Sequence, residues 1–176
     1  MSEESLTLYK LMVIYMLDNL DFPLTNSQLS EFFVNEGYTD YFHLQQTINE
    51  LIESEFIRGE VIRNTTSYHL TESGKEVLEM FDTKIPDAIK DDILAYFAEN
   101  KYQLRRESEI TADYYPLNRG EYMVTAQIKE RGNILMELNI NVVSKEQAVA
   151  ICDSWTRKSD SVYSKVMEML LLDKPE

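Results

Sequence analysis

The sequence predicts an α+β protein in two parts, and three observations carry this prediction. Residues 6–82 place apolar side chains at helical spacing, interrupted by one β-prone stretch with a turn in its middle. Residues 121–143 instead alternate apolar and polar side chains, which is typical of strands with one buried face. Residues 144–172 return to helical spacing. We therefore expect one domain over residues 1–83 and a second over residues 84–176.

Three helices are expected at the start of the first domain. Residues 6–20 are apolar on nearly every side, which predicts a helix buried on more than one face. A second helix begins at a capping box formed by Thr25 and Gln28, and Gly37 marks its end. A third helix begins after Asp40, a good N-cap residue. On a helical wheel, the apolar face of this third helix holds Tyr41, Leu44, Ile48, Leu51 and Ile52.

A hairpin and a fourth helix complete the first domain. The β-prone segments FIRGEVIR and YHL flank the turn-forming stretch NTTS, and together they are predicted to form a hairpin. The following stretch, LTESGKEVLEMF, resumes helical spacing. Three helices, a hairpin and a further helix, in this order, make a winged helix-turn-helix.

The second domain is predicted to be α-β-β-β-α, with a three-stranded antiparallel meander. Its first helix starts near Pro86, and residues 101–117 predict the first strand. The other two strands place one apolar set each on a single face: Tyr122, Val124, Ala126 and Ile128, and then Ile134, Met136, Leu138, Ile140 and Val142. Ser144 and Gln147 cap a long last helix. Its apolar stripe holds Ala148, Cys152, Trp155, Val162, Val166 and Met169.

Composition places the chain among globular proteins, with 44% apolar and 27% charged residues. The longest uncharged apolar run, Leu11 to Leu17, is much shorter than the roughly 20 residues of a membrane span. The N-terminus is acidic and lacks the basic segment of a signal peptide. The single cysteine, Cys152, cannot form an intrachain disulfide. We therefore expect a cytoplasmic protein with no membrane partner.

Two stretches of the sequence resemble known proteins. The stretch QTINELIESEFIRGEVIR, followed by YHLTESGKEVL, resembles winged-helix regulators of the MarR and PadR kind, and the resemblance covers roughly residues 6–82. The whole chain resembles an uncharacterised bacterial domain-of-unknown-function family. The segment ITADYY carries that second resemblance together with EYMVTAQIKERGNILMELNINVVSKEQAVAICDSWTRKSDSVYSKVMEML. The two resemblances imply a winged-helix fold and a regulator-like role, and supply no enzymatic activity.

Residues with catalytic or metal-binding chemistry are sparse. The histidines His43 and His69 and the lone Cys152 do not have the spacing of metal ligands. Cys152 lies on an apolar stripe beside Trp155, which favours a small buried side chain over a reactive thiol. The five glycines are scattered and form no phosphate-binding loop. We expect no enzymatic activity, no metal and no cofactor.

The third helix is the segment to which a mechanism can be attached. In helix-turn-helix proteins the start of this helix enters the major groove of DNA. The base-facing candidates near its start are Phe42, His43, Gln46, Thr47 and Asn49. Gln46 suits the N6 and N7 edge of adenine, and Thr47 or Phe42 suits the methyl group of thymine.

The charge of the chain opposes DNA binding. The net charge is −14, and residues 1–82 hold −11 of it, with four Lys or Arg against fifteen Asp or Glu. The candidates for contact with the DNA backbone are Arg58, Arg63 and Lys75, whereas Glu50 and its acidic neighbours repel phosphates. Binding is therefore expected to be weak and salt-sensitive, unless a dimer doubles the number of cations.

Two functions remain open at this point. One is a transcriptional regulator that binds double-stranded DNA, weakly or as a homodimer. The other is a non-enzymatic protein–protein interaction module that uses the winged-helix scaffold without binding DNA; a sensor of a small ligand is a third hypothesis. A homodimer would bury the spare apolar faces of Leu11–Leu17 and Trp155, although the stripe of the last helix also suits an intrachain core.

Overall fold

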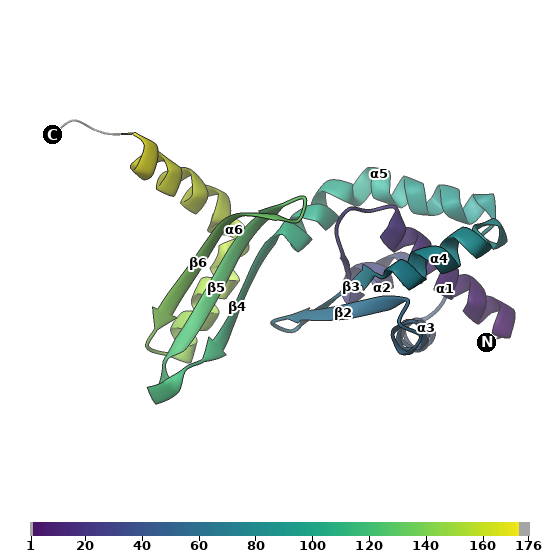
Figure 1. Cartoon of the computed structure of the whole chain (residues 1–176), viewed down its shortest axis with the longest axis horizontal. Coiled ribbons are helices and arrows are strands. Elements are labelled where there is room, and N and C mark those ends of the chain that lie inside the picture. Colours follow the sequence, from purple (N-terminus) through teal and green to yellow (C-terminus); the bar gives the residue numbers. More distant parts are fainter. Residues whose placement is uncertain (1, 173–176) are drawn as a thin grey trace. The chain divides into compact units, whose positions relative to one another are not determined.

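The chain forms a mixed α+β structure in two compact units, shown in Figure 1 as a computed structural model. The structure describes residues 2–172, and within them are six α-helices and two three-stranded antiparallel sheets. The first unit extends to Ser108 and the second begins at Glu109. The division between the two units therefore falls later in the chain than the expected boundary after residue 83.

The first unit contains most of the helices and one small sheet. Its helices are α1 (Glu3–Asp18), α2 (Asn26–Asn35), α3 (Tyr41–Glu53), α4 (Glu72–Phe81) and α5 (Asp87–Glu109), with a 3-10 turn at Asp82–Lys84. Its strands are β1 (Leu24–Thr25), β2 (Ile57–Ile62) and β3 (Thr65–Leu70), in the sheet order β1-β3-β2. The expected succession of three helices, a hairpin and a further helix is present.

Side-chain caps set the starts of α2 and α3. Thr25 Oγ1 accepts a hydrogen bond from the N–H of Gln28 at 3.1 Å, and Gln28 Oε1 accepts one from the N–H of Thr25 at 2.9 Å. Asp40 Oδ1 accepts a hydrogen bond from the N–H of His43 at 2.9 Å. Each cap pairs N–H groups that the first helical turn leaves without a partner. Both predicted helix starts are therefore confirmed.

The core of the first unit is built around α1. Every residue from Leu11 to Leu17 is buried except the half-buried Tyr15, and this segment packs with Phe32 and Phe33 of α2. A helix that is apolar on nearly every side is therefore covered within its own unit. The prediction that Leu11–Leu17 holds spare apolar surface for a homodimer is wrong.

Helix α5 belongs to the first unit and not, as predicted, to the second. Ile93, Phe97 and Leu104 are each at most 4% exposed and lie in the core that α1 and α2 form. The predicted strand over residues 101–117 is wrong in its first part, because the helix continues to Glu109. Leu104 extends the buried helical spacing of the preceding turns, and the Lys, Gln, Arg and Glu residues around it are good helix formers.

The turn of the hairpin is shorter than predicted. The strands β2 and β3 pair as far as Ile62 opposite Thr65, so that only Arg63 and Asn64 lie in the turn. The threonines and the serine of NTTS, which were predicted to form the turn, belong to β3. Threonine suits a pleated, half-buried strand better than a turn. Arg63 takes up a φ of 55°, in the left-handed region.

The second unit is a three-stranded meander with one helix on one face (Figure 1). Its elements are β4 (Ile110–Pro116), β5 (Tyr122–Glu130), β6 (Asn133–Val142) and α6 (Lys145–Leu171), with a 3-10 turn at Asn118–Gly120. The sheet order β4-β5-β6 confirms the predicted antiparallel meander. Helix α6 packs on the sheet through Trp155 and Cys152, both buried, and Trp155 Nε1 donates to the backbone oxygen of Gln127 at 3.1 Å. Trp155 is therefore part of an intrachain core, and the prediction that it offers spare surface for a homodimer is also wrong.

Strand β6 departs from its predicted alternation. A register shift pairs Ile128 with Met136 but Lys129 with Ile134. An extra residue in one strand of a pair reverses the faces beyond it, and Ile134 is 54% exposed. Ile140 is also exposed. The apolar face that the sequence predicts for β6 is therefore only partly covered.

Candidate nucleic-acid interface

Helix α3 is anchored by a narrower apolar face than the sequence predicts. Leu44, Ile48 and Leu51 are at most 1% exposed and fix the helix to the core. Tyr41 and Ile52, which are predicted for the same face, lie at the two ends of the helix and are exposed. The exposed surface of α3 therefore includes apolar as well as polar side chains.

An open groove runs along the exposed side of α3. Phe42 is 76% exposed, and Gln46 and Asn49 are exposed beside it. The groove is lined by these three residues together with Gln45, Glu50 and Glu53. Uncharged side chains therefore occupy the first half of this surface, and acids begin only in its second half.

The side chains of Thr47 and His43 form hydrogen bonds within α3 and its N-cap. Thr47 is fully buried, and its Oγ1 donates to the backbone oxygen of His43 at 2.9 Å, so the prediction that Thr47 faces a base is wrong. The half-exposed His43 places Nδ1 2.8 Å from Asp40 Oδ2. The backbone N–H of His43, followed by its side chain, holds the pKa of the Asp40 carboxyl below its usual value. This N-cap therefore fixes the histidine at the start of α3.

The carboxylate of Glu50 has two partners on the exposed face of α3. Its Oε2 lies 2.6 Å from Lys10 Nζ of α1, and its Oε1 accepts a hydrogen bond from Gln46 Nε2 at 3.1 Å. The ammonium of Lys10, and then the amide of Gln46, hold the pKa of Glu50 below its usual value. The negative charge nearest to the uncharged half of α3 is therefore offset by a cation from another helix.

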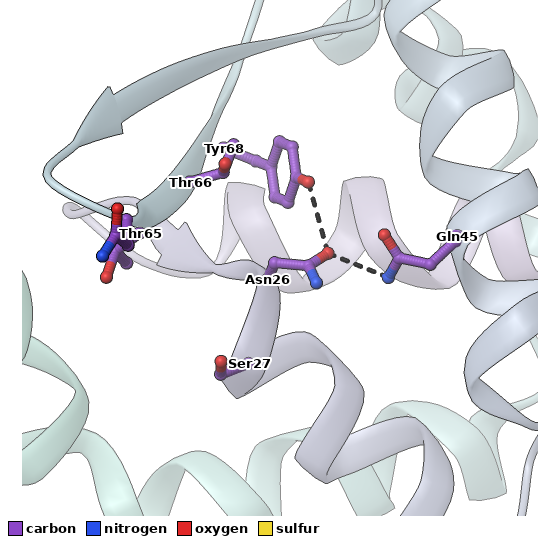
Figure 2. A pocket seen from close by; sticks show the side chains of 7 residues that line it. Asn26, Ser27, Gln45, Thr65, Thr66 and Tyr68 are labelled. Carbon is purple, nitrogen blue, oxygen red and sulfur yellow. Dashed lines mark hydrogen bonds between the residues drawn. The ribbon is translucent and has the colours of Figure 1, made fainter.

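A polar cavity of about 220 Å³ lies between the start of α2, helix α3 and the hairpin. In Figure 2, Asn26 stands between Gln45 and Tyr68, and its Oδ1 accepts hydrogen bonds from Gln45 Nε2 at 2.9 Å and from the Tyr68 hydroxyl at 3.2 Å. Ser27, Asn64, Thr65 and Thr66 complete the lining. Burial is the main cause that raises the pKa of Tyr68, so its hydroxyl stays a hydrogen-bond donor. Every side chain in the lining is polar and uncharged.

The three predicted backbone-contacting cations lie on three different elements. Arg58 is exposed on β2, and Arg63 is half-exposed in the hairpin turn, next to Asn64 of the polar cavity. Lys75 is exposed on α4, and its Nζ lies 3.3 Å from Glu72 Oε1. A carboxylate therefore offsets part of the charge of Lys75.

The profile of one protein family, described as a domain of unknown function (DUF4364), matches residues 9–170. The chain belongs to the DUF4364 family. Searches of curated proteins and of solved structures find no match for it. The expected membership of a domain-of-unknown-function family is thus confirmed, whereas a bacterial origin and the likeness to MarR and PadR regulators stay predictions.

Sequence reasoning missed several residues of this DUF4364 surface. Lys10 is 40 positions from Glu50, and Asn26 is 19 positions from its partner Gln45, as the sequence numbers show. No local sequence pattern predicts contacts between elements so far apart in the chain. The capping box at Thr25 predicts only where α2 begins. The missed residues add hydrogen-bonding groups and one cation to the surface.

The described part of the DUF4364 chain holds neither a cluster of metal ligands nor a membrane-spanning helix. Among residues 2–172, no group of three or more His, Cys, Asp or Glu side chains is placed to hold a metal ion. Over the same residues, no helix has the length and apolar character needed to cross a membrane.

Proposed function

We propose that the DUF4364 chain is a winged helix-turn-helix transcriptional regulator that binds double-stranded DNA through α3, as a homodimer. One observation carries the proposal: the exposed start of α3 presents the uncharged Phe42, Gln46 and Asn49, while Lys10 offsets the adjoining Glu50. A major groove admits a helix whose exposed amides reach base edges. The expected repulsion from Glu50 is reduced because its charge is paired.

The surroundings of α3 supply a second support. The polar cavity joins the start of α2 to the hairpin and is lined by hydroxyl and amide groups, including those of Ser27, Thr65 and Asn64. Hydroxyls, amides and the backbone N–H groups at a helix start are common donors to DNA phosphates and bear no sequence information. A chain with few cations can therefore still position a duplex here, with Arg63 beside the cavity.

The roles follow from these positions. Gln46 and Asn49 would read base edges, and Phe42 would contact a thymine methyl group. Arg58 and Arg63 would contact the DNA backbone. Two or three phosphate contacts per protomer predict that affinity falls as salt rises, with a logarithmic slope of roughly −2 to −3 for each protomer.

The direct test is selection from a random-sequence duplex library at low salt, followed by fluorescence anisotropy on the selected duplex. Arg58→Ala/Arg63→Ala is expected to weaken binding by about tenfold or more and to reduce the salt slope by about 2 for each protomer, or about 4 for the homodimer. Gln46→Ala/Asn49→Ala is expected to relax the selected sequence. The matched control is Arg157→Ala/Lys158→Ala, which removes two exposed cations from α6 of the second unit and should leave affinity unchanged.

The ion pair on α3 gives a further check. Lys10→Met leaves Glu50 without its cation, so its pKa should rise toward the usual value and DNA affinity should fall. NMR titration of the Glu50 carboxyl and anisotropy measure the two effects on one variant. If no duplex is enriched at micromolar protein while the chain is folded, the regulator proposal is refuted.

A second candidate function is a protein–protein interaction module. It is favoured by the exposed Tyr41, Phe42 and Ile52, which share α3 with the acid Glu53 and precede Glu55. Exposed aromatic residues are enriched at protein interfaces, whereas acids beside them disfavour DNA. Loss of duplex binding in the library selection, with the fold intact, is the outcome that favours this candidate.

A further inference from the structure

We propose that the second unit is the dimerisation unit, and that two copies of this chain join by antiparallel pairing of β6 with β6 and by packing of the ends of α6. This inference rests on the proposed function, because that function requires a homodimer, and it names the surface through which the homodimer forms. The experiment that tests the dimer contains no DNA, so failure to dimerise through this unit and failure to bind DNA are distinguishable.

Apolar side chains gather on β6 and on the last turns of α6. Ile134, Leu135 and Ile140 of β6 are between 38% and 54% exposed, and Met169, Leu170 and Leu171 of α6 are each more than 70% exposed. These six side chains expose on the order of 700 Å², close to the roughly 800 Å² that each partner contributes to a stable interface. We call this set the β6–α6 surface.

The end of α6 extends past the core of its own unit. Val162 and Tyr163 are the last α6 residues in the cluster formed with Ile128 and Met136. In Figure 1 the final turns of α6 pass beyond the sheet on the side of β6. A second sheet joined to that edge would lie beside those turns and would cover apolar side chains that this chain leaves exposed.

The two edges of the meander differ in their protection. At β4, the backbone N–H of Tyr114 already donates to Asp113 Oδ1 at 2.8 Å, and the strand ends in Pro116, which has no N–H. Strand β6 has ten residues, contains no Pro, Lys or Arg, and holds one charged residue, Glu137. Its edge opposite β5 pairs with no strand among the described residues. Natural proteins block exposed strand edges of this kind unless a partner uses them.

The sequence of β6 suits pairing with itself. In a two-fold antiparallel pair centred on Leu138, Met136 lies opposite Ile140 of the second copy, and Glu137 lies opposite Asn139 of the second copy. Apolar side chains thus meet apolar ones on one face, and a carboxylate meets an amide on the other. The intrachain hydrogen bond from Asn139 Nδ2 to Glu137 Oε1, at 2.9 Å, shows that the two groups suit each other. An isologous dimer needs this kind of self-complementarity.

A second copy fits this surface better than a membrane does. Interfacial helices that bind membranes carry Lys and Arg on their polar face, which anionic lipids attract. The last turns of α6 instead hold Glu168 next to Met169, and the whole chain carries a net charge of −14. Repulsion from anionic lipid therefore opposes membrane binding.

The test is the molar mass of the full-length chain in solution, measured by light scattering over a range of concentrations. The wild-type protein is expected at twice its chain mass of 20.6 kDa at micromolar concentration. Met169→Glu and Leu135→Lys should each raise the dimer dissociation constant at least tenfold, because two-fold symmetry introduces each charge twice. Matched controls in the first unit are Met80→Glu on α4 and Val61→Lys on β2, both at residues 66% exposed, and these should leave the dimer intact.

Hydrogen exchange at two protein concentrations tests the strand pairing separately. Alternate backbone N–H groups of β6 should gain protection as the dimer forms, and those of β4 should not. A wild-type protein that stays at 20.6 kDa at tens of micromolar overturns the proposal. So does a dimer that survives both surface variants, that the controls dissociate equally, or that shows no added protection in β6.

Discussion

Gly74 is the position where a single methyl group should do most harm to the first unit. It lies in the first turn of α4, against the end of the α3–β2 connection, and its N–H donates to Thr71 Oγ1 at 3.1 Å. A Cβ added to Gly74 would stand 2.2 Å from the backbone oxygen of Phe56 and 2.6 Å from Leu70 Cδ1. Carbon and carbonyl oxygen normally approach no closer than roughly 3.3 Å. The substitution Gly74→Ala therefore forces α4 and the backbone at Phe56 apart by about 1 Å.

The free energy of unfolding should fall by about 2–4 kcal/mol. Overpacking of this kind costs about 1–3 kcal/mol. The displacement also strains two hydrogen bonds that hold the start of α4, from the Thr71 N–H to Phe56 O at 3.1 Å and from Thr71 Oγ1 to Glu55 O at 2.7 Å. These contribute about 1 kcal/mol each, and the better helix propensity of alanine returns about 1 kcal/mol.

Urea unfolding followed by far-UV circular dichroism measures this loss. Trp155, the one tryptophan of the chain, lies in the second unit, so its fluorescence reports on that unit separately. The matched control is Gly59→Ala in β2, whose added Cβ would meet Thr66 Cγ2 at an ordinary 3.5 Å. This control should be neutral or slightly stabilising. A Gly74→Ala protein within about 0.5 kcal/mol of the wild type would refute the close approach, since alanine otherwise favours the helix.

Two further predictions concern a buried hydroxyl and a half-buried phenol. Ser159 of α6 is fully buried and its hydroxyl has no hydrogen-bond partner among the described residues, so Ser159→Ala should stabilise the second unit by about 1 kcal/mol, measured by Trp155 fluorescence in urea. The exposed Ser161→Ala, in the same helix, isolates the gain in helix propensity, and equal effects of the two would contradict the argument. Burial, reinforced by nearby carboxylates of which Glu31 is the first, raises the pKa of Tyr96 from 10.0 to about 12. The folded state therefore holds this proton more tightly than the unfolded state, so stability should be insensitive to it below pH 10 and should fall as the pH rises toward 12. Tyr96→Phe should lose less stability than the wild type between pH 9 and about pH 11 in urea titrations, and an unchanged loss would contradict the prediction.

Local patterns predicted much of the first unit. The capping box at Thr25 and the N-cap at Asp40 are read from residues three positions apart, and both are present. The alternation of β5 survives in its buried Val124 and Ala126. Such features depend on near neighbours in the sequence, so periodicity and caps suffice to place them.

The placement of α5 could not be predicted in the same way. Its apolar spacing shows a helix but does not tell which unit covers that helix, and Ile93 and Phe97 are buried against the first unit. Contacts such as Arg105 Nη2 with Asp21 Oδ1, at 2.7 Å, join residues far apart in the chain. The bulge that exposes Ile134 is another example, because a register shift is a property of two paired strands and not of one.

Contacts between residues far apart in the sequence also change the electrostatic repulsion expected at the candidate interface. A net charge counts every carboxylate equally, and by that count the first part of the chain repels DNA. In the structure, Lys10 Nζ lies 2.6 Å from Glu50 Oε2 and offsets the charge of that carboxylate. A paired carboxylate contributes less to the field at the groove than an isolated one, because the field of its partner opposes it. Of the two acids that line the groove, Glu50 is paired with Lys10, so Glu53, at the far end of the groove from Phe42, contributes more of the repulsion that DNA would meet there.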